Sequence, residues 1–346
     1  MINKIIENNS MAAYDFVSCF FIESMIEYKK ILFYILKGET NNMSSKIKKL
    51  PLATSELMLG FGVGGFLLNS YSQVLSKAFG FITLILFLNI FSKLLLDNKG
   101  VKKDLNNPLI ASIFPSFFMG GMILTTYLQK YIGGGALILW EVLVLSHFLF
   151  IYTYTKKFLW SFKLKMIYPS IFITYSGLFM VSITAKYFDM FYIGQLAFWF
   201  GLFSFILFLP FVLFRVFKYK DLTEKEIPTL GNLCAPGAMG VIGYLTVFHD
   251  INMYMVVFLL TISTFIYFMV LGIIGKLIKV PFNYNFSSFT FPMLICPLGS
   301  KVAYEYLSKL SDFSNFGLLI KGQEIIGFII LIYISVRYFI SIYLKD

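Results

Sequence analysis

Charged residues are scarce in this sequence. Asp, Glu, Lys and Arg make up 14% of the 346 residues, whereas 58% are hydrophobic and the mean hydropathy is +0.78. A chain of this composition cannot bury its apolar surface in one water-soluble core, so much of that surface must face lipid. The composition therefore excludes an ordinary soluble protein and predicts an integral membrane protein.

Cysteine and histidine are also rare. The three cysteines, Cys19, Cys234 and Cys296, form no C-x-x-C pair, and the two histidines, His147 and His249, are far apart in the sequence. These spacings indicate neither a disulfide framework nor a zinc site. We therefore expect no metal and no cofactor.

Long apolar runs, by contrast, are plentiful. A membrane-spanning helix needs roughly 20 mostly apolar residues, and runs of this length are too long for the strands of a membrane barrel. The sequence predicts an all-α integral membrane protein with ten spans, at residues 52–69, 75–96, 109–128, 133–154, 168–187, 192–216, 229–248, 252–276, 286–308 and 318–343.

Positive charges are divided unevenly between the predicted loops. Of the 29 Lys and Arg residues, 23 lie on one side of the ten predicted spans and 6 on the other. Because cytoplasmic loops carry an excess of Lys and Arg, we expect both termini in the cytoplasm and the chain in the cell membrane. This topology accounts for the net charge of +11, so a nucleic-acid partner is not expected.

The first 50 residues differ from the rest. Residues 11–38 hold short apolar runs that are broken by acidic and basic residues, too short and too charged to span a membrane. This cytoplasmic N-terminal segment, residues 1–50, is compatible with a helix lying in the membrane interface or with a true translation start at Met43. Residues 51–346 then form the membrane domain.

Prolines mark an internal repeat. Pro51, Pro108, Pro169, Pro228 and Pro281 stand at the entrances of alternate predicted spans, separated by 57, 61, 59 and 53 residues. Each repeat therefore holds two spans, which predicts five helical hairpins in a row. Since each hairpin crosses the membrane an even number of times, all five point the same way, and parallel units of this kind arrange about an axis along the membrane normal.

The odd and even spans also differ in composition. Nine of the ten prolines lie in or just before odd spans, which also carry glycine-rich stretches such as GFGVGG at 60–65 and CAPGAMG at 234–240. Small residues let helices pack closely, and interrupted backbone is tolerated where it is buried in protein or lines a wet cavity. We therefore expect the odd spans to form an inner ring around a central pore and the even spans to face lipid.

Candidate pore residues come from the odd spans. The predicted pore-shaping residues are Gly60, Gly64, Pro115, Pro236, Pro292 and Pro297, and the predicted polar contacts are Ser116, Ser170, Thr174, Ser287 and Ser288. Charged candidates are Glu56 and a pair, Lys301 and Glu305, whose spacing of four would bring them together on one helix face. No chain of acidic residues or histidines runs through the middle of these spans, which argues against a proton pump.

Six motifs, in order, carry a resemblance to a known family. They are LGFGVGG (59–65), NNPLIASIFPSFFMG (106–120), ILWEVLVLSHFLF (138–150), IYPSIFITYSG (167–177), TLGNLCAPGAMGVIGYL (229–245) and FSSFTFPMLICPLG (286–299). Over roughly residues 50–345 the sequence resembles the tellurite-resistance/dicarboxylate transporter family, which includes the plant slow anion channels. The resemblance implies five helical hairpins around a central pore, a homotrimer, and passage of chloride, nitrate, C4-dicarboxylates or tellurite-type oxyanions.

The resemblance also implies one residue role. In channel-like members a phenylalanine of the ninth helix plugs the pore, and the match at TFPM assigns that role to Phe291. The sequence departs from the family at Glu56, where relatives usually carry a small or apolar residue, and at the Lys301–Glu305 pair. A carboxylate near the pore opposes anions, which argues against plain high-flux anion conduction.

We therefore expect transmembrane transport of small anions through a gated pore, with the lipid bilayer and the anion as partners. Two alternatives are a non-conducting accessory protein on the same fold and a membrane-embedded enzyme. The enzyme would need a convergent acid, base or nucleophile near an interface, and the two distant histidines offer none.

Overall fold

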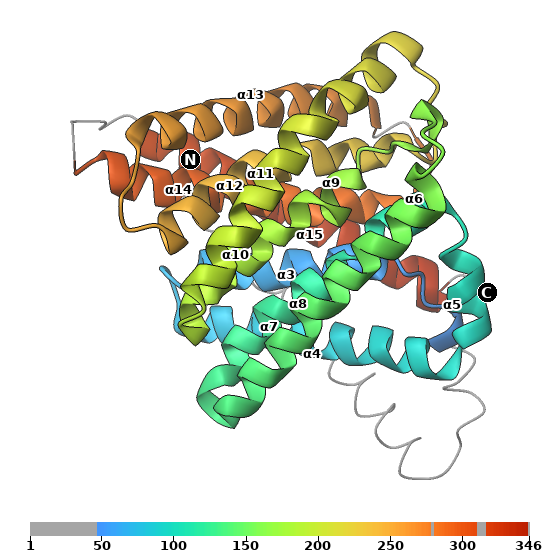
Figure 1. Cartoon of the computed structure of the whole chain (residues 1–346). Helices are drawn as coiled ribbons and strands as arrows, with labels where there is room; N and C mark the ends of the chain where they lie inside the picture. Colours follow the sequence, from blue (N-terminus) through green and yellow to red (C-terminus); the bar gives the residue numbers. More distant parts are fainter. Residues whose placement is uncertain (1–46, 278–279, 310–315, 345–346) are drawn as a thin grey trace, which may run out of the picture. The chain divides into compact units, whose positions relative to one another are not determined.

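The computed structural model of the chain describes residues 47–277, 280–309 and 316–344. All regular secondary structure in these residues is helical (Figure 1). The chain divides into a unit of residues 1–49 and a unit of residues 50–346, and the second unit holds the helices from α3 to α15. Residues 1–46 lie outside the described residues, and with them the predicted interfacial helix and the alternative start at Met43.

Seven helical segments of the described residues are long and apolar enough to cross a membrane. They are α4 (Gln73–Leu96), α6 and α7 together (Pro108–Ile113 and Ser116–Ile132), α8 (Gly134–Tyr154), α11 (Phe191–Phe214), η6 and α12 together (Ile227–Leu233 and Ala235–Val247), α13 (Met253–Leu277) and α15 (Phe316–Phe339). The chain is therefore a multi-pass helical membrane protein, as its composition predicts.

The three other predicted spans are short or interrupted. Span 52–69 contains α3 (Thr54–Leu68), which at 15 residues and 1.5 Å per residue is roughly 22 Å long. Span 168–187 is divided into α9 (Ile171–Thr174), η3 (Ser176–Leu178) and α10 (Phe179–Ala185), and span 286–308 into η7 (Tyr284–Phe289) and α14 (Thr290–Leu307). The prediction of ten spans thus stays a prediction.

Alternate helices differ in burial. In the most apolar stretch of each segment, 83% of α6 and α7 and 89% of η6 and α12 is buried, against 28% of α4, α13 and α15. Of the 15 residues of α3, 13 are buried. The less buried helices expose large apolar side chains such as Phe203 of α11, Phe265 of α13 and Leu318 of α15, as lipid-facing helices do. The compositional difference between odd and even spans therefore corresponds to a difference in burial.

The buried helices contact one another in a closed cycle. Helix α3 packs against α7, α7 against α10, α10 against α12, α12 against α14, and α14 against α3. Each outer helix packs on the inner helix that precedes it in the chain: α4 on α3, α8 on α7, α11 on α10, α13 on α12 and α15 on α14. In Figure 1, α13 and α4 lie along opposite edges of this unit, with α3, α12 and α14 between them.

Prolines stand where the inner helices are interrupted. Pro115 separates α6 from α7, Pro236 lies in the first turn of α12, and Pro292 lies in the first turn of α14, directly after η7. A proline is tolerated at such positions because the first amide groups of a helix have no partner within the helix. Pro292 therefore does not kink a continuous helix, although the apolar run around it suggests one. Pro297 does lie inside α14.

Helix α3 approaches α14 closely at Gly60. A Cβ atom at Gly60 would lie 2.8 Å from Cβ of Thr290 and 3.2 Å from the backbone nitrogen of Phe291. At Gly64 a Cβ atom would lie 3.1 Å from the ring of Phe79 and 3.4 Å from Leu294. Glycine at position 60 thus sets the separation of α3 from the start of α14.

We predict that Gly60→Ala destabilises the protein by about 1–3 kcal/mol, because the added methyl group overpacks the α3–α14 contact. The measurement is the apparent melting temperature in detergent. Gly322→Ala in α15 is the matched control, since nothing lies within 4 Å of a Cβ atom built at Gly322. Equal melting temperatures for the two variants would contradict the prediction.

Candidate functional site

A fully buried carboxylate, that of Glu56, links three inner elements. Its Oε1 accepts a hydrogen bond from Nδ2 of Asn232 at 2.8 Å, and its Oε2 accepts from the hydroxyls of Ser288 at 2.7 Å and Ser287 at 2.9 Å. The hydroxyl of Thr290 donates to the main-chain carbonyl of Glu56 at 3.0 Å. The group formed by these five residues, the Glu56 cluster, joins α3 to η6, η7 and α14.

No cation balances this carboxylate within the described residues. The ion pairs recorded there are Lys93–Asp104, Arg215–Asp221 and Lys301–Glu324. Burying a charge without a counter-ion is costly unless hydrogen bonds compensate. The three donors on its oxygens are what stabilise an ionised Glu56.

Asn232 is a site residue that the sequence reasoning missed. It is fully buried in η6 and donates to Glu56. Its side chain could have identified it in the sequence, because an amide within an otherwise apolar span is uncommon and indicates a specific partner. Its Oδ1 atom has no hydrogen-bond partner among the described residues.

The five predicted polar contacts join neighbouring inner helices. The hydroxyl of Ser116 lies 2.6 Å from that of Ser55, and the hydroxyl of Ser170 lies 2.5 Å from that of Ser112. Thr174 donates to the carbonyl of Ser112 at 3.0 Å. Ser287 and Ser288 belong to the Glu56 cluster, and all five predicted residues are fully buried. In this conformation their hydroxyls connect helices, while their predicted contact with an anion stays a prediction.

Phe291 is fully buried in the first turn of α14. Its backbone nitrogen lies against Gly60, and its neighbour Thr290 is bonded to Glu56. The structure therefore places the residue predicted to plug the pore one position after the Glu56 cluster.

A pocket of about 470 Å³ lies at the C-terminal ends of the inner helices. Each of the five contributes to its lining: α3 through Phe66, α7 through Tyr127, α10 through Ile183, α12 through Ile242 and α14 through Leu298. We call this pocket the vestibule. It begins seven residues after Phe291 along α14, which is roughly 10 Å at 1.5 Å per residue.

Charged side chains also line the vestibule, namely Lys186, Lys301 and Glu305. Lys186 is exposed. The ammonium group of Lys301 lies 2.5 Å from the hydroxyl of Ser70 and 3.9 Å from the carboxylate of Glu324.

The expected Lys301–Glu305 pair is not formed. Lys301 instead contacts Glu324 of α15 and the loop between α3 and α4. The Lys301 ammonium lies 4.6 Å from the centre of the Tyr71 ring, and the Tyr71 hydroxyl donates to Glu324 at 2.6 Å. This bond raises the pKa of Tyr71 to about 12, so its phenol stays protonated and keeps donating at physiological pH. The contacts tie the rim of α14 to α15 and to the end of α3.

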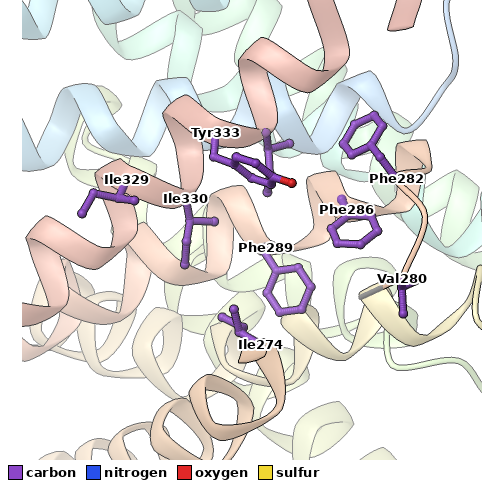
Figure 2. Close-up of a pocket in the computed structure, with 9 residues that line it drawn as sticks. Ile274, Val280, Phe282, Phe286, Phe289, Ile329, Ile330 and Tyr333 are labelled. Atoms are coloured by element: carbon purple, nitrogen blue, oxygen red, sulfur yellow. The ribbon is translucent and has the colours of Figure 1, made fainter. Parts of the chain in front are cut away.

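A second pocket, of about 310 Å³, is apolar (Figure 2). Phe282, Phe286 and Phe289 line it together with Ile330 and Tyr333 of α15. Phe289 therefore faces this pocket, although it stands only two residues before Phe291. The near absence of polar groups makes the pocket unsuitable for a small anion.

Nothing in the described residues suggests a metal centre. No group of three or more His, Cys, Asp and Glu side chains in that part of the chain could hold a metal ion. His147 is buried and its Nε2 lies 2.9 Å from the carbonyl of Thr174, a local contact between α8 and α9.

Comparison with known proteins identifies a family. The SLAC1 family model, described as voltage-dependent anion channel, matches residues 49–340, which include every helix from α3 to α15. This match confirms the family resemblance found in the six sequence motifs. No curated protein matches the chain.

Proposed function

The chain belongs to the voltage-dependent anion channel family, and we propose that it passes small anions through a gated pore along the axis of the five inner helices. The observation that carries this proposal is the vestibule, to which all five inner helices contribute. We infer that a pocket to which every member of a closed cycle of helices contributes lies near the axis of that cycle, where a pore would open.

The charges near the vestibule suit an anion. Two cations, Lys186 and Lys301, lie in its lining beside one carboxylate, that of Glu305, and an excess of positive charge in a cleft raises the local concentration of anions. Deeper in the protein, α7, α12 and α14 begin at the interruptions of the inner helices. The N-terminal end of a helix carries a partial positive charge that favours anions. The volume of the vestibule accommodates an inorganic anion, a tellurite-type oxyanion or a C4-dicarboxylate, so we propose small anions as the substrate class.

We propose Phe291 as the gate. Its ring is fully buried, and along α14 Phe291 stands between Thr290 of the Glu56 cluster and Leu298 of the vestibule. At this position its ring would close the pore. Moving an aromatic ring off its preferred rotamer costs about 0.5–1.5 kcal/mol, which a bound substrate or a small backbone shift can supply.

The proposal includes ten spans, arranged as five parallel hairpins. The short α3 and the interrupted α9–α10 and η7–α14 segments would then cross as inner spans. Interrupted backbone is tolerated at membrane depth when protein covers it, and α3, α9, α10 and α14 are largely buried. The excess of Lys and Arg on one side of the predicted spans favours an orientation in the cell membrane with both termini in the cytoplasm. The family resemblance favours a homotrimer.

We predict that Phe291→Ala raises anion flux in liposomes roughly two- to tenfold, the factor that corresponds to a barrier of about 0.5–1.5 kcal/mol. Flux is measured with chloride, nitrate and succinate, and we expect the unaltered chain to pass at least one of them. Phe289→Ala is the matched control, because it removes the same volume from a ring that faces the apolar pocket.

Equal flux for Phe291→Ala and the unaltered chain, with both folded, would remove Phe291 as the gate. No flux of any of the three anions through either variant or the unaltered chain would favour a non-conducting accessory protein.

A further inference from the structure

Glu56 is a buried ionisable group of α3, and none of the ion pairs among the described residues involves it. The phenol of Tyr338 in α15 donates to the carbonyl of Tyr284 in η7, the same carbonyl that the Ser287 hydroxyl reaches. The cationic side chains of the helices packed against α3 and α14 have other contacts or are exposed. Lys93 contacts Asp104, Lys301 contacts Glu324, Arg337 lies over the rings of Phe282 and Tyr333, and Lys77, Lys130 and Lys321 are exposed.

The Glu56 cluster can satisfy a neutral carboxyl as well as an ionised one. When Glu56 is ionised, Asn232, Ser287 and Ser288 donate to it. When it carries a proton, a half-turn of the Asn232 amide brings Oδ1, which is unpartnered among the described residues, to the place of Nδ2 to accept that proton. The Ser287 hydroxyl also has the carbonyl of Tyr284 at 2.9 Å as a second acceptor. Both protonation states therefore have hydrogen bonds available.

A change of charge at Glu56 acts close to the proposed gate. Thr290, which donates to the Glu56 carbonyl, immediately precedes Phe291. Gly60, one helical turn after Glu56, lies against Thr290 and the backbone of Phe291. A carboxylate at this position repels an anion in the pore, and the repulsion is strong where water is excluded. Protonation removes it.

We propose that Glu56 binds a proton and that anions pass the gate only while this proton is bound. The step is a reversible transfer of a proton from hydronium to the carboxylate, which gives a neutral carboxylic acid and water. Return of the proton to water restores the carboxylate. A single such group is not a proton relay, in agreement with the lack of an acidic chain through the inner spans. The proposal rests on the proposed anion pore.

The test is the pH dependence of chloride flux in liposomes, with the same pH on both sides so that no proton gradient drives the flux. Between about pH 8 and about pH 5, the range in which buried Glu residues titrate, we expect the flux of the unaltered chain to rise about tenfold or more. Glu56→Gln, which mimics the neutral carboxyl, should give high flux that does not depend on pH. Glu141→Gln, at an exposed position of α8, should keep the pH profile of the unaltered chain.

Two further variants keep the carboxyl titratable. Glu56→Asp should retain a pH-dependent flux with a displaced midpoint. Ser288→Ala removes a donor to the ionised form, so its midpoint should move to higher pH. A Glu56→Gln variant with the pH profile of the unaltered chain, or an unmoved midpoint in Ser288→Ala, would overturn the proposal while leaving the anion pore intact. Absence of chloride, nitrate and succinate flux through the unaltered chain at every pH would instead overturn the pore, and this inference with it.

Discussion

Interrupted backbone within a membrane must find its hydrogen bonds inside the protein, because hydrocarbon offers no partner. The inner helices are interrupted near Pro115, Tyr175, Cys234 and Phe289, and the outer helices cover them. The interruptions are also bridged by side chains. Ser55 with Ser116, Ser112 with Ser170 and Thr174, and Glu56 with its donors connect each interrupted segment to a neighbour. The packing of outer helices over inner helices therefore protects the interrupted backbone from lipid.

The need for internal hydrogen bonds also makes the two ends of the inner helices different. Toward the C-terminal ends of α3, α7, α10, α12 and α14 the cycle widens into the vestibule, which has a polar and charged lining. Toward the N-terminal ends of α7, α12 and α14 the hydroxyls and Glu56 are fully buried and bonded to each other. Phe291 lies between the two. If Phe291 is the gate, this structure is the closed state, in which groups that would contact an anion are engaged with neighbouring helices.

Much of the fold was predictable because it depends on composition. The apolar excess required a membrane protein, and the placement of prolines and glycines on alternate spans anticipated which helices would be buried. Details that depend on partners distant in sequence were not predictable. Lys301 contacts Glu324 rather than Glu305, since the packing of α15 on α14 decides which carboxylate is near. Asn232 was missed for the same reason, because its partner Glu56 lies 176 residues away. Pro292 suggested a kink, whereas the change from η7 to α14 at Phe289 gives it a first-turn position.

The central claim is that the vestibule and the Glu56 cluster lie on one pore that Phe291 closes. The most direct test is labelling with a charged thiol reagent added from the vestibule side, in a chain whose native cysteines are replaced by alanine. Leu298→Cys, in the vestibule lining, should react readily, whereas Ser287→Cys, in the Glu56 cluster, should react only when combined with Phe291→Ala. Reaction of Ser287→Cys at the same rate with and without Phe291 would contradict the claim.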